Sequence, residues 1–87
     1  MYYIYILKCE DGSLYTGITN DLERRFKEHQ NKIGGRYTSS HRPEKIVYTE
    51  TSKTRSNALK CEAQIKSWPR KKKMVLINTT KNQHYVN

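Results

Sequence analysis

The chain has 87 residues, a length that accommodates one small domain and excludes a protein with several hydrophobic cores. Hydrophobic residues make up 34% of it, so we expect a thin core and no large, deep pocket. The formal net charge is +9, and residues 51–87 carry one acidic residue, Glu62, among nine basic ones; such a surface attracts polyanions, of which nucleic acid is the common cytosolic example and anionic membrane the alternative.

The chain shows no signal for secretion or membrane insertion. No run of 18 apolar residues occurs, and the first strand-like segment begins at Met1 without a basic region before it. The two cysteines, Cys9 and Cys61, do not form a CxxC pair, and we interpret both as reduced packing residues. We therefore expect a cytoplasmic protein without a membrane span.

The N-terminal segment predicts a β-hairpin. Residues 2–9 carry apolar residues on both alternating faces, which is typical of a strand covered by helices on both sides. Asp11-Gly12 is a turn signal, and residues 14–19 predict the returning strand.

Residues 21–33 predict a helix that begins after Asn20 or Asp21 and stops before Gly34-Gly35. Arg25 borders its apolar stripe, and Arg24 points away from it. The stripe consists of Leu22, Phe26, His29 and Ile33.

The second half predicts a loop, a strand and two helices. Residues 36–43 are rich in polar residues and proline, and residues 44–50 predict a third strand. A second helix begins near Ser52 or Thr54 and continues to Ser67, and a short third helix starts at residues 67–69 with Pro69 in its first turn. The fold class is thus α+β, a small three-stranded antiparallel sheet flanked by three helices in the order ββαβαα.

The second helix presents an apolar arc that contains one carboxylate. Ala58, Cys61, Ile65 and Trp68 share the arc, and Leu59 and Ala63 widen it. Glu62 is one turn from both Ala58 and Ile65, so it lies within this arc. A carboxylate in that position requires an explanation.

Several residues whose chemistry suits a phosphodiester follow one another in order. They are Tyr5, Tyr15, Arg25, His29 and Glu62. With Tyr3-Ile4-Tyr5, Tyr15-Thr16-Gly17, Arg24-Arg25 and Glu28-His29, the sequence resembles the GIY-YIG nuclease family, in particular its small single-domain bacterial members. The resemblance extends through Glu62 to about Ile77, so we expect a nuclease domain over residues 1–77 and a polar tail over 78–87.

The resemblance implies Mg²⁺-dependent hydrolysis of DNA, with Mn²⁺ as a substitute ion. Glu62 would hold the metal, Tyr5 or Tyr15 would act as general base or position the water, and Arg25 would bind the phosphate. His29 faces the same way as Arg25, one helical turn later. Basic residues near the second and third helices would bind substrate: Lys66, Arg70, Lys71, Lys72 and Lys73.

Each of these residues also has a purely structural interpretation. The two tyrosines could be core or cross-strand residues, His29 a satisfied core histidine, and Glu62 the ion-pair partner of Arg25. The run from Arg70 to Lys73 could be a solvated helix face. We favour the site because the residues occur as an ordered set.

The sequence departs from the family pattern at Tyr3, which stands in place of the first glycine of the first tripeptide, and at Asn20. Many members carry a lysine where this chain has Asn20, and a late asparagine often completes their site, for which Asn78 and Asn82 are candidates after the third helix. With no attached DNA-reading domain in the chain, we expect recognition through phosphate contacts and shape, or through a protein partner that supplies specificity.

If Tyr5 and Tyr15 belong to one site, both must lie on the same face of the sheet, and this condition determines the register of the hairpin. A two-residue Asp11-Gly12 loop would place Tyr5 and Tyr15 on opposite faces of the sheet. A three-residue loop ending at Gly12 places Tyr5 opposite Gly17 and both tyrosines on one face, so we predict this longer loop.

Three hypotheses remain. The first is an Mg²⁺-dependent endonuclease of low sequence specificity, which could act on branched or nicked DNA in repair or recombination. The second is a catalytically weak nucleic-acid-binding module of the same fold, for which RNA is also a candidate ligand. The third is a basic adaptor that docks on an acidic protein or a membrane.

Overall fold

The computed structural model describes residues 1–31 and 41–79. Within them, the elements follow the predicted order ββαβαα, and the three strands form one antiparallel sheet in the order β2-β1-β3. The elements are β1 (Tyr2–Cys9), β2 (Leu14–Thr19), α1 (Leu22–Gln30), β3 (Pro43–Ser52), α3 (Arg55–Lys66) and α4 (Arg70–Thr79).

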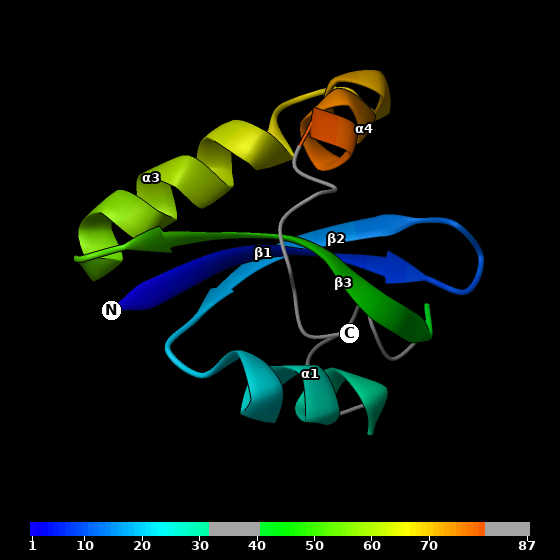
Figure 1. Cartoon of the computed structure of the whole chain (residues 1–87), viewed down its shortest axis with the longest axis horizontal. Helices are drawn as coiled ribbons and strands as arrows, with labels where there is room; N and C mark the ends of the chain where they lie inside the picture. Colours follow the sequence, from blue (N-terminus) through cyan, green and yellow to red (C-terminus); the bar gives the residue numbers. More distant parts are fainter. Residues whose placement is uncertain (32–40, 80–87) are drawn as a thin grey trace.

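The sheet is covered on both faces, as the apolar pattern of β1 predicts. Helices α3 and α4 lie on one face, and α1 lies on the other (Figure 1). On the side of α3 and α4, Ile4 and Ile6 pack with Ala58 and Ile65. On the side of α1, Tyr5 and Leu7 pack with Ile46, Leu22 and Phe26. The alternation of side chains along the central strand β1 thus separates two small cores.

The turn between β1 and β2 has three residues, which confirms the predicted register. Tyr5 pairs with Gly17, and Leu7 pairs with Tyr15. Gly12 has φ +86°, a left-handed conformation that glycine adopts without steric cost. Its N–H donates to the carbonyl of Cys9 at 2.9 Å. Tyr5 and Tyr15 therefore lie on the same face of the sheet.

Helix α1 begins where the sequence predicts, with Asp21 as its N-cap. The Asp21 carboxylate accepts a hydrogen bond from the Arg24 N–H at 3.1 Å, which satisfies one of the open donors of the first turn. The helix ends at Gln30, three residues before the predicted end. The predicted stripe residue Ile33 lies outside the described residues, as do Gly34-Gly35 and the predicted loop up to residue 40.

Helix α3 starts at one of the two predicted positions, and its buried face is smaller than predicted. Thr54 caps the helix by accepting a hydrogen bond from the Asn57 N–H at 3.1 Å, so the helix starts after Thr54 rather than Ser52. Leu59 and Ala63, predicted to widen the apolar arc, are exposed. They lie on the flank of α3 that turns away from the sheet, so the buried arc is narrower than the sequence suggests.

Helix α4 differs from its prediction at both ends. The Pro69 carbonyl accepts hydrogen bonds from the N–H groups of Lys72 and Lys73 at 3.0 and 3.2 Å, so Pro69 caps the helix instead of occupying its first turn. The helix continues through Thr79, so Asn78 is part of it rather than after it, two residues beyond the predicted end of the domain. Asn82 lies outside the described residues.

Both cysteines are free, as predicted: Cys9 is fully buried, and Cys61 is half-buried on α3. Among the helices at residues 22–30, 55–66 and 70–79, none combines the length and the apolar character needed to cross a membrane.

Candidate active site

Gly17 allows the Tyr5 side chain to lie across the edge strand β2. A Cβ atom at position 17 would be 2.6 Å from the Tyr5 hydroxyl oxygen and 2.8 Å from the ring carbon that carries it. Such distances are too short for any side chain, so the tyrosine occupies the volume that a residue other than glycine would need. The Tyr5 hydroxyl consequently lies against the edge strand β2 while remaining buried.

Three of the predicted site residues form an aromatic cluster on the side of α1. The ring centroid of Tyr15 lies 6.3 Å from that of Tyr5 and 5.1 Å from that of His29, and the Tyr5 and His29 rings are 6.0 Å apart. The Tyr5 hydroxyl oxygen lies 2.9 Å from His29 Nε2. Residues from β1, β2 and α1 are therefore brought into one contact group, as the ordered set predicts.

Burial determines the protonation state of this pair. Burial, with a smaller contribution from the positive charge of Arg25, lowers the pKa of His29 to about 4. Burial likewise raises the pKa of Tyr5, against the lowering effect of a hydrogen bond from Arg25. At neutral pH both groups are uncharged. The Tyr5 oxygen accepts a hydrogen bond from Arg25, and the Tyr5 O–H can donate to His29 Nε2 when that nitrogen carries no proton.

Glu28 orients Arg25, a role that was not predicted for it. Arg25 Nη1 lies 3.0 Å from Glu28 Oε1, and the Arg25 side chain is only 29% exposed. Glu28 Oε2 also lies 3.9 Å from Arg24 Nε. The spacing of three residues between Arg25 and Glu28 is the only sequence signal for this contact, and it is common on helices.

Glu62 and Lys66 approach the same edge from α3. Glu62 Oε2 pairs with Lys66 Nζ at 3.2 Å, and the Glu62 side chain is 16% exposed. Lys66 Nζ lies 6.0 Å from the Tyr15 ring centroid. The negative charge of Glu62 is also close enough to Tyr5 to contribute to its raised pKa. Because β2 is an edge strand, these α3 side chains can approach the cluster past the sheet.

Glu62 is chemically suited to hold a hard divalent cation. No group of three or more His, Cys, Asp or Glu side chains within residues 1–31 and 41–79 could enclose a metal ion. Mg²⁺ commonly uses one or two carboxylates, with water and substrate phosphate oxygens completing its coordination. A single, mostly buried carboxylate whose charge acts on Tyr5 fits this type of open site.

The predicted substrate-binding residues divide into two groups. Lys66 is part of the site through Glu62 and Tyr15. The others, Arg70 to Lys73, form the first turn of α4, where Lys72 Nζ lies 4.4 Å from the Trp68 ring centroid. They make a basic surface on the side of the sheet opposite α1 (Figure 1).

Asn20, at the position where many family members carry lysine, holds an arginine. Its Oδ1 accepts a hydrogen bond from Arg24 Nη2 at 3.2 Å. The Arg24 side chain is 58% exposed, which agrees with the prediction that it points away from the apolar stripe. The Arg24 guanidinium thus places a positive charge next to Asn20, although the chain has no lysine at this position.

The comparisons with known proteins agree on one family. Residues 1–75 match the model of the GIY-YIG catalytic domain. UPF0213 protein SSP2268 of Staphylococcus saprophyticus is 51% identical over 77 residues, which are 88% of this chain and 94% of that protein. A UPF0213 protein of Bacillus pumilus is 45% identical over 76 residues, which are 87% of this chain and 78% of that protein.

Two solution NMR structures are similar to the chain over most of its length. UPF0213 protein BH0048 from Bacillus halodurans has a TM-score of 0.61 and 37% identity, and the match covers 94% of this chain and 88% of that one. Protein EF2693 from E. faecalis has a TM-score of 0.63 and 39% identity, with 99% and 92% covered.

Proposed function

The chain belongs to the GIY-YIG catalytic domain family, a family of nucleases, and from this premise we propose that it is a metal-dependent endonuclease that hydrolyses DNA phosphodiester bonds with little sequence specificity. The observation that carries the proposal is the position of the Tyr5 hydroxyl, between the neutral His29 imidazole and the Arg25 guanidinium. This is the arrangement needed to move a proton next to a bound phosphate.

In the proposed reaction, Tyr5 and His29 remove a proton from the attacking water. The Tyr5 oxygen takes the proton of the water while the phenol proton passes to His29 Nε2. The water oxygen forms a bond to phosphorus, the bond from phosphorus to the leaving sugar oxygen breaks, and this oxygen takes a proton from solvent to leave as an alcohol. The imidazolium then returns its proton to solvent. A neutral His29 is required for this relay, because an imidazolium cannot accept the proton.

Arg25 binds the scissile phosphate and stabilises the charge that develops on its oxygens. Glu28 keeps the guanidinium in place, and the resulting rigidity limits the ordering that substrate binding must supply. Glu62 would hold Mg²⁺ or Mn²⁺, which supplies Lewis acidity toward the phosphate when bound. The Lys66 ammonium group, 3.2 Å from Glu62 Oε2, balances the negative charge of this carboxylate.

The basic first turn of α4 would contact the DNA backbone. Contacts of this kind carry no base information, so recognition would depend on backbone shape, as in branched or nicked DNA, or on a protein partner. The proposed setting is DNA repair or recombination in the cytoplasm.

Glu62→Gln tests the proposal. We expect labelled single-stranded, duplex, flap, fork and four-way-junction DNA to be cut by the wild type with Mg²⁺ or Mn²⁺ but not with EDTA. The variant should lose at least 100-fold in cleavage rate, on the order expected when a metal ligand is removed, while DNA affinity stays within about threefold. Glu44→Gln, which removes an exposed carboxylate near Lys8, is the matched control and should cut like the wild type. Metal-dependent cleavage that persists in Glu62→Gln would contradict the proposal.

A second candidate is a nucleic-acid-binding module with little activity. The Lys66–Glu62 ion pair favours it, because an ammonium group already compensates the carboxylate that would hold the metal. Such a module would bind DNA or RNA in EDTA with a steep salt dependence and leave every substrate intact. A basic adaptor would instead bind heparin as well as any DNA structure.

A further inference from the structure

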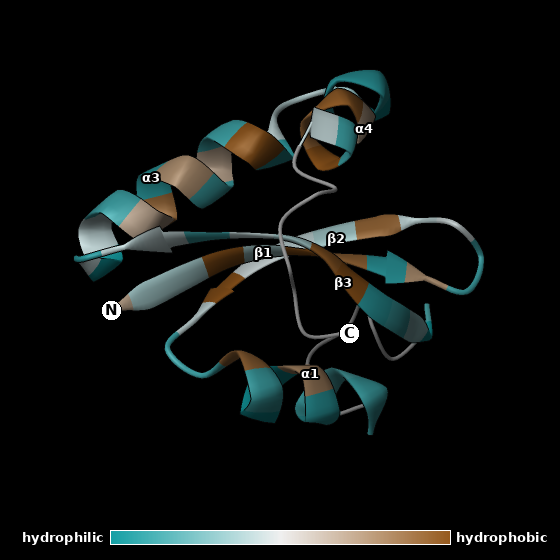
Figure 2. Cartoon of the chain, in the orientation of Figure 1, coloured by the Kyte–Doolittle hydropathy of each residue, from teal (hydrophilic) through white to brown (hydrophobic). Residues whose placement is uncertain are grey.

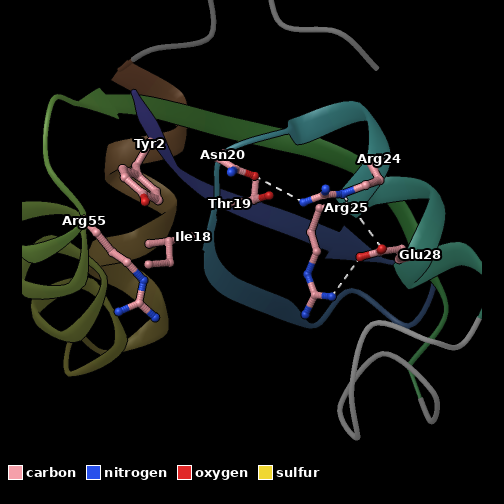
Figure 3. A pocket seen from close by; sticks show the side chains of 8 residues that line it. All are labelled: Tyr2, Ile18, Thr19, Asn20, Arg24, Arg25, Glu28 and Arg55. Carbon is pink, nitrogen blue, oxygen red and sulfur yellow. Dashed lines mark hydrogen bonds and ion pairs between the residues drawn. The ribbon is translucent and has the colours of Figure 1, made fainter.

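A charged pocket opens at the end of the hairpin where β2 runs into α1. It has a volume of about 360 Å³ and lies between α1 and the start of α3 (Figure 3). Arg24 and Arg25 line it from α1, and Arg55 lines it from the first turn of α3. Tyr2 and Ile18 give it an apolar wall. Figure 3 shows Arg55 extending into it from one side and Arg25 from the other.

The lining of the pocket carries excess positive charge. Three arginines face one acidic lining residue, Glu28. Arg55 also lies in the first turn of α3, where the open N–H groups already produce a partial positive charge and the turn has no acidic residue. Like charges that converge from two helices reduce stability unless an anion is bound between them.

The arginines on α1 are oriented before any ligand binds. Asn20 Oδ1 accepts from Arg24 Nη2 at 3.2 Å, and Glu28 contacts both Arg24 and Arg25, at 3.9 and 3.0 Å. A guanidinium has five N–H donors, so Arg24 can keep this contact and still donate to a phosphate. The pocket therefore presents positioned donors to an anion.

Arg25 connects this pocket to the candidate active site, because it both lines the pocket and hydrogen-bonds the Tyr5 hydroxyl. We propose that the pocket binds a second backbone phosphate, next to the scissile one on the same strand, with Arg24 and Arg55 as its ligands. The inference rests on the proposed function, since it takes Arg25 as the ligand of the scissile phosphate. Tyr2 and Ile18 would pack against the sugar between the two phosphates.

The proposal makes a strand with at least two consecutive phosphodiesters the substrate class. A compound with a single phosphodiester would leave one of the two phosphate positions empty. Oligonucleotides with one, two and three phosphodiester bonds separate these cases: dTpT, dTpTpT and dTpTpTpT. In EDTA their affinities can be measured by NMR titration of the isotope-labelled protein without any cleavage.

For the wild type we expect affinity to rise about tenfold from one phosphodiester to two, and by much less from two to three. We call the gain in affinity from one phosphodiester to two the first step. Arg55→Gln and Arg24→Gln should each reduce it to about twofold or less. The matched control is Arg42→Gln, an exposed arginine near Glu10 at the other end of the hairpin, which should keep the full step. Amide spectra of the variants establish that they are folded.

An undiminished first step in both Arg55→Gln and Arg24→Gln would overturn the inference, as would an equal loss in Arg42→Gln. The outcome is independent of cleavage. If the Arg55-dependent step is present but no DNA is cut, the pocket stands and the nuclease proposal fails. If DNA is cut but the step is absent from the wild type, the nuclease proposal stands and the pocket fails.

Discussion

The two faces of the sheet have different kinds of core. On the side of α3 and α4, the buried side chains are mainly aliphatic, with Ile4, Ile6 and Ile65 at the centre. On the side of α1, the fully buried groups include the polar pair Tyr5 and His29. In Figure 2, α1 is coloured mostly hydrophilic, whereas α3 and α4 carry more hydrophobic segments.

This difference shows how a thin core can support both folding and chemistry. Burying an imidazole and a phenol costs free energy unless both are hydrogen-bonded, and the lowered pKa of His29 is a direct expression of that cost. The burial of the mainly aliphatic side offsets this cost. Because β1 alternates between the two sides, each side can be altered by itself, and three predictions follow from this separation.

The largest effect on stability is expected from Ile6→Ala, on the aliphatic side. Ile6 is completely buried, so its truncation should lower the free energy of unfolding by about 2–5 kcal/mol. Urea denaturation measures the loss. DNA affinity per folded molecule should remain unchanged, because Ile6 points away from the site. If Ile6→Ala is too unstable to purify, Ile6→Val should lose about 0.5–1.5 kcal/mol. An altered affinity in the folded variant would mean that the two sides are coupled.

On the polar side, lowering the pH should reduce the free energy of unfolding by about 3 kcal/mol through the protonation of His29. The pKa of His29 is about 4 in the folded protein and about 6.5 in the unfolded chain, so the unfolded state binds the proton first as pH falls. The stabilisation is complete above pH 6.5 and is lost progressively towards pH 4. His29→Gln should lack this part of the pH dependence.

NMR titration of the imidazole tests the same point without relying on a variant. His29 should stay neutral down to about pH 5. A midpoint near 6.5 would show that burial does not hold the ring in its neutral form, and the proposed relay would then lose its proton acceptor at slightly acidic pH.

The smallest effect on stability, and the sharpest contrast in function, is expected from two matched tyrosines. The Tyr5 hydroxyl contacts His29 Nε2 at 2.9 Å, and the Tyr48 hydroxyl donates to Glu50 at 2.6 Å on the other side. Tyr5→Phe and Tyr48→Phe should each lower stability by about 1 kcal/mol, the usual value for one hydrogen bond. Only Tyr5→Phe should abolish cleavage. Equal cleavage by both variants would remove Tyr5 from the mechanism.

Much of the fold follows from local sequence patterns. The apolar pattern of residues 2–9 predicts a strand covered on both sides. The turn signal at Asp11-Gly12 allowed two loop lengths, and the requirement that Tyr5 and Tyr15 share a face selected the one that pairs Tyr5 with Gly17. Asp21 and Thr54 mark the starts of α1 and α3 because they satisfy open N–H groups within the next turn. The end of α1 and the flank of α3 were predicted less well, since neighbouring elements determine where a helix stops and which residues it buries.

The sequence by itself determined the element order, because periodicity and turn signals act over short distances. The register of the hairpin and the convergence of Tyr5, Tyr15 and His29 were predicted only with the added expectation, taken from the family resemblance, that these residues form one site. The ion pairs Glu28–Arg25 and Lys66–Glu62 lie within single helices, at spacings of three and four residues that permit such pairs without selecting them. Only the tertiary structure decided that Arg55 joins the arginines of α1 in one pocket. This pocket depends on how α1 and the start of α3 are placed around the sheet, and no spacing along the chain encodes that geometry.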